Sequence, residues 1–169
     1  MRYLLSLLFL FSLCSFGFSQ KDIKVYIFMS EECVICQSYT PYLNELHDRY
    51  AGQGIDIIGV FPNFSSKKKK IEAFKEKYQI EYELKTDYFR SLTEQFQVRI
   101  TPEVIVFDEI QASILYRGRI DNTYFRVGKR RRVTTTSELK DTLEAIIQNK
   151  EILITSTQPI GCIINVKKF

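Results

Sequence analysis

The sequence predicts an α/β fold in which a central mixed sheet carries helices on both faces. Short apolar runs of strand length alternate along the chain with longer segments of helical periodicity, which is typical of α/β sheets. Two later strand-like runs are joined by a short turn, which indicates an antiparallel hairpin within that sheet. The chain has 169 residues, of which 45% are hydrophobic, enough for one domain with a substantial core.

The N-terminus has the pattern of a secretory signal peptide. Arg2 precedes an apolar run over residues 3–13, and small residues follow, ending at Ser19. We expect cleavage after Ser19, so that residues 1–19, with Cys14, are lost. An uncleaved anchor is the alternative, but the run is short against the roughly 20 apolar residues that a spanning helix needs.

The remaining chain divides into a folded domain over residues 20–150 and a C-terminal extension over residues 151–169. The formal net charge of +4, or +3 without the leader, is too small to indicate a nucleic-acid partner. Export would place the three remaining cysteines, Cys33, Cys36 and Cys162, in an oxidising periplasmic or extracellular space. An odd number implies one thiol without an internal partner, or a pair that changes partners.

The first half of the domain alternates strands and helices. The expected elements are a strand over 25–29, a helix over 36–50 that contains Pro41, a strand over 55–61, and a helix with Ile71, Phe74 and Tyr78 on one face. Ser65 or Ser66 is expected to cap the second helix, because a serine oxygen can accept a bond from a free N–H of the first turn. We expect the lysines at 67–70 to be solvated.

The second half predicts a short strand, a short helix, the hairpin and a last helix. The expected elements are a strand over 83–87, a helix over 88–96 with Phe89, Leu92 and Phe96 inward, strands over 103–107 and 113–116, a charged loop over 119–134 with a solvated basic run at 129–132, a capping box over 135–138, a helix burying Leu139, Leu143, Ile146 and Ile147, and an edge strand over 152–154.

The first strand leads directly into a pair of cysteines at the start of a helix. Cys33 and Cys36 are three residues apart, so both face one side of the first helical turn. A helix N-terminus favours thiolate there, and a dithiol so placed can open and close a disulfide. Glu31 and Glu32 oppose the thiolate by their charge. A permanent structural disulfide is the alternative to a redox-active one.

These residues resemble the thioredoxin superfamily. The shared pattern is a strand, Cys-x-x-Cys, a helix with Pro41 five residues after Cys36, and Thr101-Pro102 just before a strand. The sequence is most similar to the exported redoxin or TlpA-like branch and to peroxiredoxin-like proteins of the AhpC/TSA type. The segment before the first cysteine, FMSEEC, lacks the Pro and Thr that typical peroxiredoxins carry, which favours disulfide chemistry over peroxide chemistry.

The resemblance implies a thioredoxin-like fold and a thiol–disulfide oxidoreductase that needs no cofactor beyond a redox-active Cys33–Cys36 disulfide. Cys33 is the expected nucleophile and Cys36 the resolving thiol. Pro102 is implied to be cis, with the backbone of Thr101 pairing with the partner polypeptide. The expected partners are protein thiols and disulfides, with a membrane or exported electron donor as a further candidate, and the protein is expected to be a monomer.

Two other functions stay open on the same residues. A peroxiredoxin-like thiol peroxidase would oxidise Cys33 to a sulfenic acid and resolve it with Cys36 or Cys162. A metal-binding redoxin module would use the cysteines together with His47. His47, however, follows Cys36 by eleven residues, about 16 Å along a helix, so no metal site is predicted.

Three further residues are accessory candidates. Cys162 can resolve a Cys33 sulfenic acid, pair with another protein, or lie buried as an inert thiol, since isoleucines surround it. Arg117 and Arg119 can supply positive charge to a thiolate or peroxide, or be ordinary surface charges at a strand end.

Overall fold

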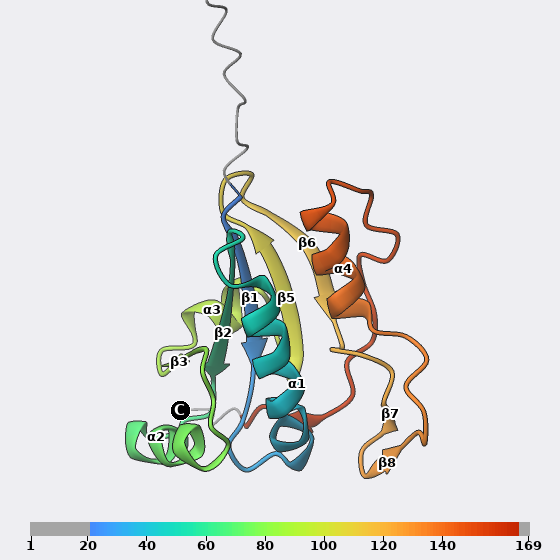
Figure 1. Cartoon of the computed structure of the whole chain (residues 1–169). Coiled ribbons are helices and arrows are strands. Elements are labelled where there is room, and N and C mark those ends of the chain that lie inside the picture. Colours follow the sequence, from blue (N-terminus) through green and yellow to red (C-terminus); the bar gives the residue numbers. More distant parts are fainter. Residues whose placement is uncertain (1–20, 166–169) are drawn as a thin grey trace, which may run out of the picture.

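The computed structural model describes residues 21–165 and shows a five-stranded sheet between helices (Figure 1). The predicted signal peptide over residues 1–19, with Cys14, lies outside this range. No helix within it is both long and apolar enough to cross a membrane.

The main sheet is of mixed direction, as predicted. Its strands lie in the order β3-β2-β1-β5-β6. They are β1 Ile23–Phe28, β2 Ile55–Phe61, β3 Glu83–Thr86, β5 Glu103–Asp108 and β6 Ser113–Gly118. The first three are parallel to one another, and β5 and β6 form an antiparallel hairpin that joins the sheet beside β1.

The central strand β1 is buried on both faces. Val25 pairs with Ile57 of β2 on one side and with Val106 of β5 on the other. Val25 and Ile27 point into one hydrophobic cluster and Tyr26 and Phe28 into a second, so the period of two along the strand separates the two cores.

Helices cover both faces of the sheet, also as predicted. The helices are α1 Val34–Tyr50, α2 Lys68–Lys77, α3 Ser91–Gln95 and α4 Glu138–Ile147. Three of them, α1, α2 and α4, bury apolar side chains in the first cluster, for example Leu43, Phe74 and Leu143. The segment around α3 contributes Phe96 and Val98 to the second cluster, on the opposite face.

Two short strand pairs complete the fold. One joins β7 Tyr124–Arg126 to β8 Lys129–Arg130. The other joins β4 Ile100–Thr101 to β9 Cys162–Ile163. The second pair brings the C-terminal segment back to the loop that precedes β5, near the start of α1.

The C-terminal segment is also fastened to the end of β6. The amide of Arg117 donates to Thr155 O at 3.0 Å, and the amide of Thr157 donates to Arg117 O at 3.0 Å. Gly118 has φ of +144°, and a Cβ at this position would collide with Thr157. Glycine is therefore required where the segment crosses the strand end.

Some predicted boundaries are wrong. The helix expected over 88–96 begins only at Ser91, because Arg90 is left-handed at φ 61° and Asp87 accepts bonds from the amides of Leu92 and Thr93. Phe89 therefore lies before the helix and is 85% exposed instead of inward. The expected loop over 119–134 contains the β7–β8 hairpin.

The predicted caps and edge strand are also wrong. Ser66 donates to Glu31 Oε2 at 2.5 Å instead of capping α2. Thr135 is held by the side chain of Asn122, so α4 begins at Glu138 with no capping box. The edge strand expected over 152–154 is absent from the described chain, because pairing with β6 starts beyond it, at Thr155.

We predict that Leu43→Ala destabilises the fold by about 2–5 kcal/mol, because Leu43 is fully buried and its removal leaves a cavity in the larger cluster. Chemical denaturation of the two proteins measures the change. The matched control is Leu153→Ala, which removes the same atoms at a site that is 89% exposed and should stay within about 0.5 kcal/mol of the parent. Equal losses for both variants would contradict the assignment of the core.

Candidate functional site

Cys33 and Cys36 lie between the end of β1 and the first turn of α1. Cys33 is the N-cap residue of α1, with φ −84° and ψ 113°, and its carbonyl accepts a 3.0 Å bond from the amide of Gln37. Cys36 lies in the first turn. The exposed fractions are 3% for Cys33 and 0% for Cys36, so both sulfurs belong to the core and neither is freely open to water.

Hydrogen-bond donors around Cys33 make it the acidic thiol of the site. The pKa of Cys33 is lowered to about 5, and the hydrogen bond from the Cys36 thiol is the largest cause. Hydrogen bonds from the Cys162 thiol and from the amides of Cys36 and Ile35 lower the pKa further, whereas burial raises it. Full burial raises the pKa of Cys36 well above its usual range. The pair therefore consists of a thiolate and a neutral thiol at neutral pH.

The two glutamates before Cys33 are engaged by α2 and the loop before it. Lys70 Nζ lies 2.9 Å from Glu32 Oε1 and 3.9 Å from Glu31 Oε1, and Ser66 Oγ donates to Glu31 Oε2. Their charge is thus partly compensated by a lysine from the run that we expected to be solvated. Sequence reasoning missed Ser66 and Lys70 as part of the site, since nothing in their own neighbourhood marks α2 as the element beside the cysteines.

Thr101 and Pro102 lie beside the cysteines, and the peptide bond between them is cis, as the resemblance implied. The carbonyl oxygen of Thr101 is 3.5 Å from Cys33 Sγ, so it can accept a bond from the protonated thiol. Thr101 also belongs to β4, whose backbone pairs with β9. The loop before β5 therefore forms one wall of the thiol site.

Cys162 lies next to Cys33, within the same thiol site. Its Sγ is 2.9 Å from Cys33 Sγ. Burial and the hydrogen bond to Cys33 raise the pKa of Cys162 to about 11. Within residues 21–165, Cys33, Cys36 and Cys162 form no disulfide. Isoleucines flank Cys162 in sequence, but only Ile164 is buried, while Ile163 is 82% exposed. Cys162 is therefore in contact with the Cys33 thiol of the site.

The two accessory arginines are bound by carboxylates. Arg117 lies 3.0 Å from Glu103 Oε1 and donates to Phe96 O at 2.8 Å, and Arg119 Nε lies 3.0 Å from Glu138 Oε1. Among the residues described, their side-chain hydrogen bonds go to these oxygens and none goes to a sulfur.

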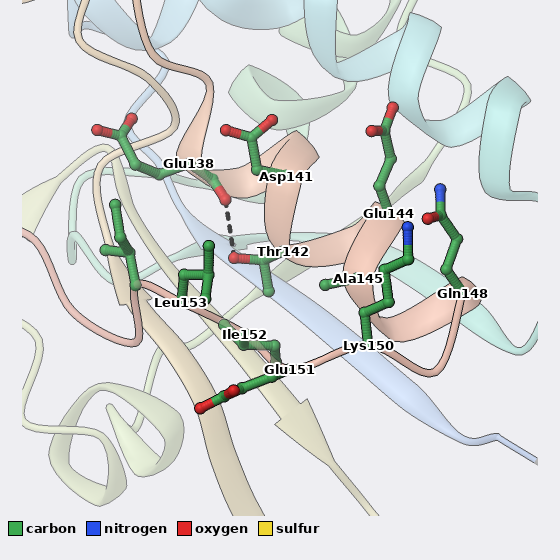
Figure 2. A pocket seen from close by; sticks show the side chains of 11 residues that line it. Glu138, Asp141, Thr142, Glu144, Ala145, Gln148, Lys150, Glu151, Ile152 and Leu153 are labelled. Carbon is green, nitrogen blue, oxygen red and sulfur yellow. Dashed lines mark hydrogen bonds between the residues drawn. The ribbon is translucent and has the colours of Figure 1, made fainter.

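His47 lies far down α1 from the thiols, where its ring meets that of Tyr82 at 6.3 Å. Within residues 21–165 no group of three or more His, Cys, Asp or Glu side chains has an arrangement fit for a metal ion. A separate pocket of about 300 Å³ lies between α4 and the segment after it (Figure 2), and its walls include Thr142, Ala145 and Ile152 but none of the cysteines.

Comparisons with known proteins show the family and the fold. The sequence model of the AhpC/TSA family matches residues 11–126, more than half of the chain. The chain belongs to the AhpC/TSA family. No curated protein matches it in sequence.

Solved structures show the same thioredoxin-like fold. A hypothetical protein from Sinorhizobium meliloti superposes with a TM-score of 0.76 at 20% identity, over 89% of this chain and 82% of that one. An uncharacterized conserved protein from Geobacillus kaustophilus gives 0.76 at 18% identity, over 89% and 80%. The thioredoxin domain of a thiol-disulfide oxidoreductase from Bacteroides vulgatus gives 0.56 at 17% identity, over 76% and 81%.

We predict that Cys33 loses its proton with a midpoint near pH 5, seen as a rise in the ultraviolet absorbance of thiolate as the pH increases. Cys36→Ala removes the main donor and should move the midpoint up toward the ordinary thiol value. Cys36→Ser keeps an O–H donor and should move it less. A midpoint near pH 9 in the parent protein would contradict the assignment of Cys33 as the thiolate.

Proposed function

We propose that this AhpC/TSA family member is a thiol–disulfide oxidoreductase that exchanges disulfides with exported protein partners through Cys33 and Cys36. The observation that carries the proposal is the difference between the two thiols. Hydrogen bonds lower the pKa of Cys33 to about 5, and burial raises that of Cys36 far above neutral pH. Cys33 is therefore a thiolate, the nucleophilic form, at neutral pH, whereas Cys36 is a neutral thiol that can release its proton later in the reaction.

In the proposed exchange, the Cys33 thiolate reacts first and the Cys36 thiol reacts second. The Cys33 thiolate attacks one sulfur of a partner's disulfide, a Cys33–partner bond forms, and the partner's other sulfur leaves as a thiolate that takes up a proton. Cys36 then loses its proton and attacks Cys33 Sγ, which releases the partner's second thiol and leaves a Cys33–Cys36 disulfide. The partner gains two electrons and this protein loses two; the reverse sequence oxidises a partner.

The loop of Thr101 and Pro102 would position the partner polypeptide. Thr101 lies in β4, a two-residue strand that pairs by main-chain bonds, and its carbonyl is 3.5 Å from Cys33 Sγ. An extended segment that adds to β4 would bring its own cysteine to Cys33. Strand addition of this kind recognises backbone more than side chains, so it suits an enzyme with several protein partners.

Export is part of the proposal and rests on sequence. Residues 1–19 have the pattern of a signal peptide, and an oxidising space outside the cytoplasm is where protein disulfides persist. The Bacteroides vulgatus neighbour, a thiol-disulfide oxidoreductase by name, shares the fold; the activity proposed for this chain rests on its own cysteines.

A thiol peroxidase is the second candidate, and the 2.9 Å contact between Cys33 and Cys162 favours it, because a nearby thiol can resolve a sulfenic acid. The carboxylates that hold Arg117 and Arg119 count against it, since those guanidinium groups are then not directed at a peroxide on Cys33. The two functions differ in their oxidant, so a hydrogen peroxide assay separates them.

We predict that Cys33→Ser abolishes reduction of a protein disulfide such as that of insulin, a loss of at least about 1,000-fold, because no other thiol of the site is a thiolate at neutral pH. Turbidity of the released insulin chains follows the reaction.

The trapping variant replaces Cys36 and Cys162 by serine together, since both sulfurs lie next to Cys33. It should accumulate mixed disulfides with partners, visible on non-reducing gels and absent when Cys33 is also replaced. Rapid turnover of hydrogen peroxide by this variant with a small thiol, without any trapped protein, would favour the peroxidase and reject our first choice.

A further inference from the structure

The C-terminal segment 161–164 lies across the thiol site as an added strand. Cys162 pairs with Thr101 and Ile163 with Ile100 in the β4–β9 ladder. The amide of Ile164 donates to Arg99 O at 2.9 Å, and its side chain, 2% exposed, belongs to the second hydrophobic cluster. The segment is therefore docked by backbone pairing and by one buried side chain.

The docked segment places Cys162 next to Cys33. With β9 in place, Cys162 Sγ lies 2.9 Å from Cys33 Sγ, and Cys33 is only 3% exposed. The approach is close at the backbone as well, because a Cβ at Gly161 would collide with the carbonyl of Thr101. Gly161 thus permits the contact that sets Cys162 against the nucleophile.

The segment is attached to the fold at two separate places, one before residue 158 and one after it. Thr155 and Thr157 are bonded to the backbone of Arg117 at the end of β6, and the Thr157 hydroxyl meets that of Tyr116 at 2.7 Å. Beyond this attachment, the described part of the segment is joined to the rest by the short β4–β9 ladder, a few single hydrogen bonds and the buried side chain of Ile164. Releasing those would uncover Cys33 while the remainder of the fold stays in place.

Because β9 occupies the edge of β4, a partner strand cannot use that edge at the same time. We propose that segment 161–164 is an intramolecular substrate of Cys33, in which Cys162 takes the place of a partner's cysteine. The oxidised protein then exchanges between a Cys33–Cys36 and a Cys33–Cys162 disulfide. A partner protein must displace the segment before it can react with Cys33. The inference rests on the proposed function and adds its regulation.

The exchange between the two disulfides is balanced within the chain. Cys162 loses a proton and attacks Cys33 Sγ of the Cys33–Cys36 disulfide. The Cys33–Cys162 bond forms, the Cys33–Cys36 bond breaks, and Cys36 leaves as a thiolate that takes up the proton. No electrons are gained or lost overall, so no further oxidant or reductant is needed after the first oxidation.

Peptide mapping of the oxidised full chain tests the proposal, with oxidised glutathione as the oxidant. Trypsin places Cys33 and Cys36 together in peptide 25–49, Cys162 in peptide 151–167 and Cys14 in peptide 3–21. A Cys33–Cys36 disulfide therefore stays within one peptide, whereas Cys162 links two. We expect both forms in the parent protein and the linked pair as the main product in Cys36→Ser.

Gly161→Ala keeps every cysteine and forces the segment away from Thr101. It should reduce the linked pair about tenfold or more and raise the rate at which a maleimide alkylates Cys33 in the reduced protein by a similar factor. The matched control is Ile163→Ala, on the exposed side of the same strand, which should change neither. Cys162→Ser should remove the linked pair but leave Cys33 covered.

Failure of this inference and failure of the proposed function give different results. A Cys33–Cys36 disulfide with no linked peptide, in the parent and in Cys36→Ser, overturns the intramolecular substrate and leaves the oxidoreductase intact. No reaction of Cys33 with oxidised glutathione in any variant, Gly161→Ala included, overturns the oxidoreductase itself.

Discussion

The site depends on the burial of a thiolate at the start of α1. A buried charge is costly unless hydrogen bonds replace the water it has lost. Cys33 receives them from the thiols of Cys36 and Cys162 and from amides of the first helical turn. The three cysteines therefore form one electrostatic unit in which the central sulfur carries the charge and its two neighbours keep their protons.

The fold supplies each part of this unit from a different place. The strand β1, paired on both sides, fixes where α1 begins, and the antiparallel β5 brings the loop of Thr101 to the same end of the sheet. The C-terminal segment reaches the site only because it is first attached to β6 and then pairs with β4. The AhpC/TSA family match ends at residue 126, so the third cysteine comes from beyond the matched region.

Local patterns in the sequence predicted the mixed sheet and the helices, because apolar periodicity determines them. The cis bond before Pro102 was implied by the resemblance to the thioredoxin superfamily. Side-chain contacts that apolar periodicity does not reveal explain what was missed. Asp87 shortens α3 and leaves Phe89 exposed, and Asn122 takes Thr135 away from its expected cap. Cys162 lies 129 residues from Cys33 in the chain, so no local pattern places their sulfurs together.

The central claim is that Cys33 takes part in every disulfide that this protein forms within itself. The most direct measurement oxidises the full chain with a disulfide, alkylates the remaining thiols and maps the alkyl groups by mass spectrometry. We expect alkylation at Cys36 or at Cys162, and none at Cys33. An alkylated Cys33 together with a Cys36–Cys162 disulfide, or alkylation of Cys33, Cys36 and Cys162 together after full oxidation, would contradict the account.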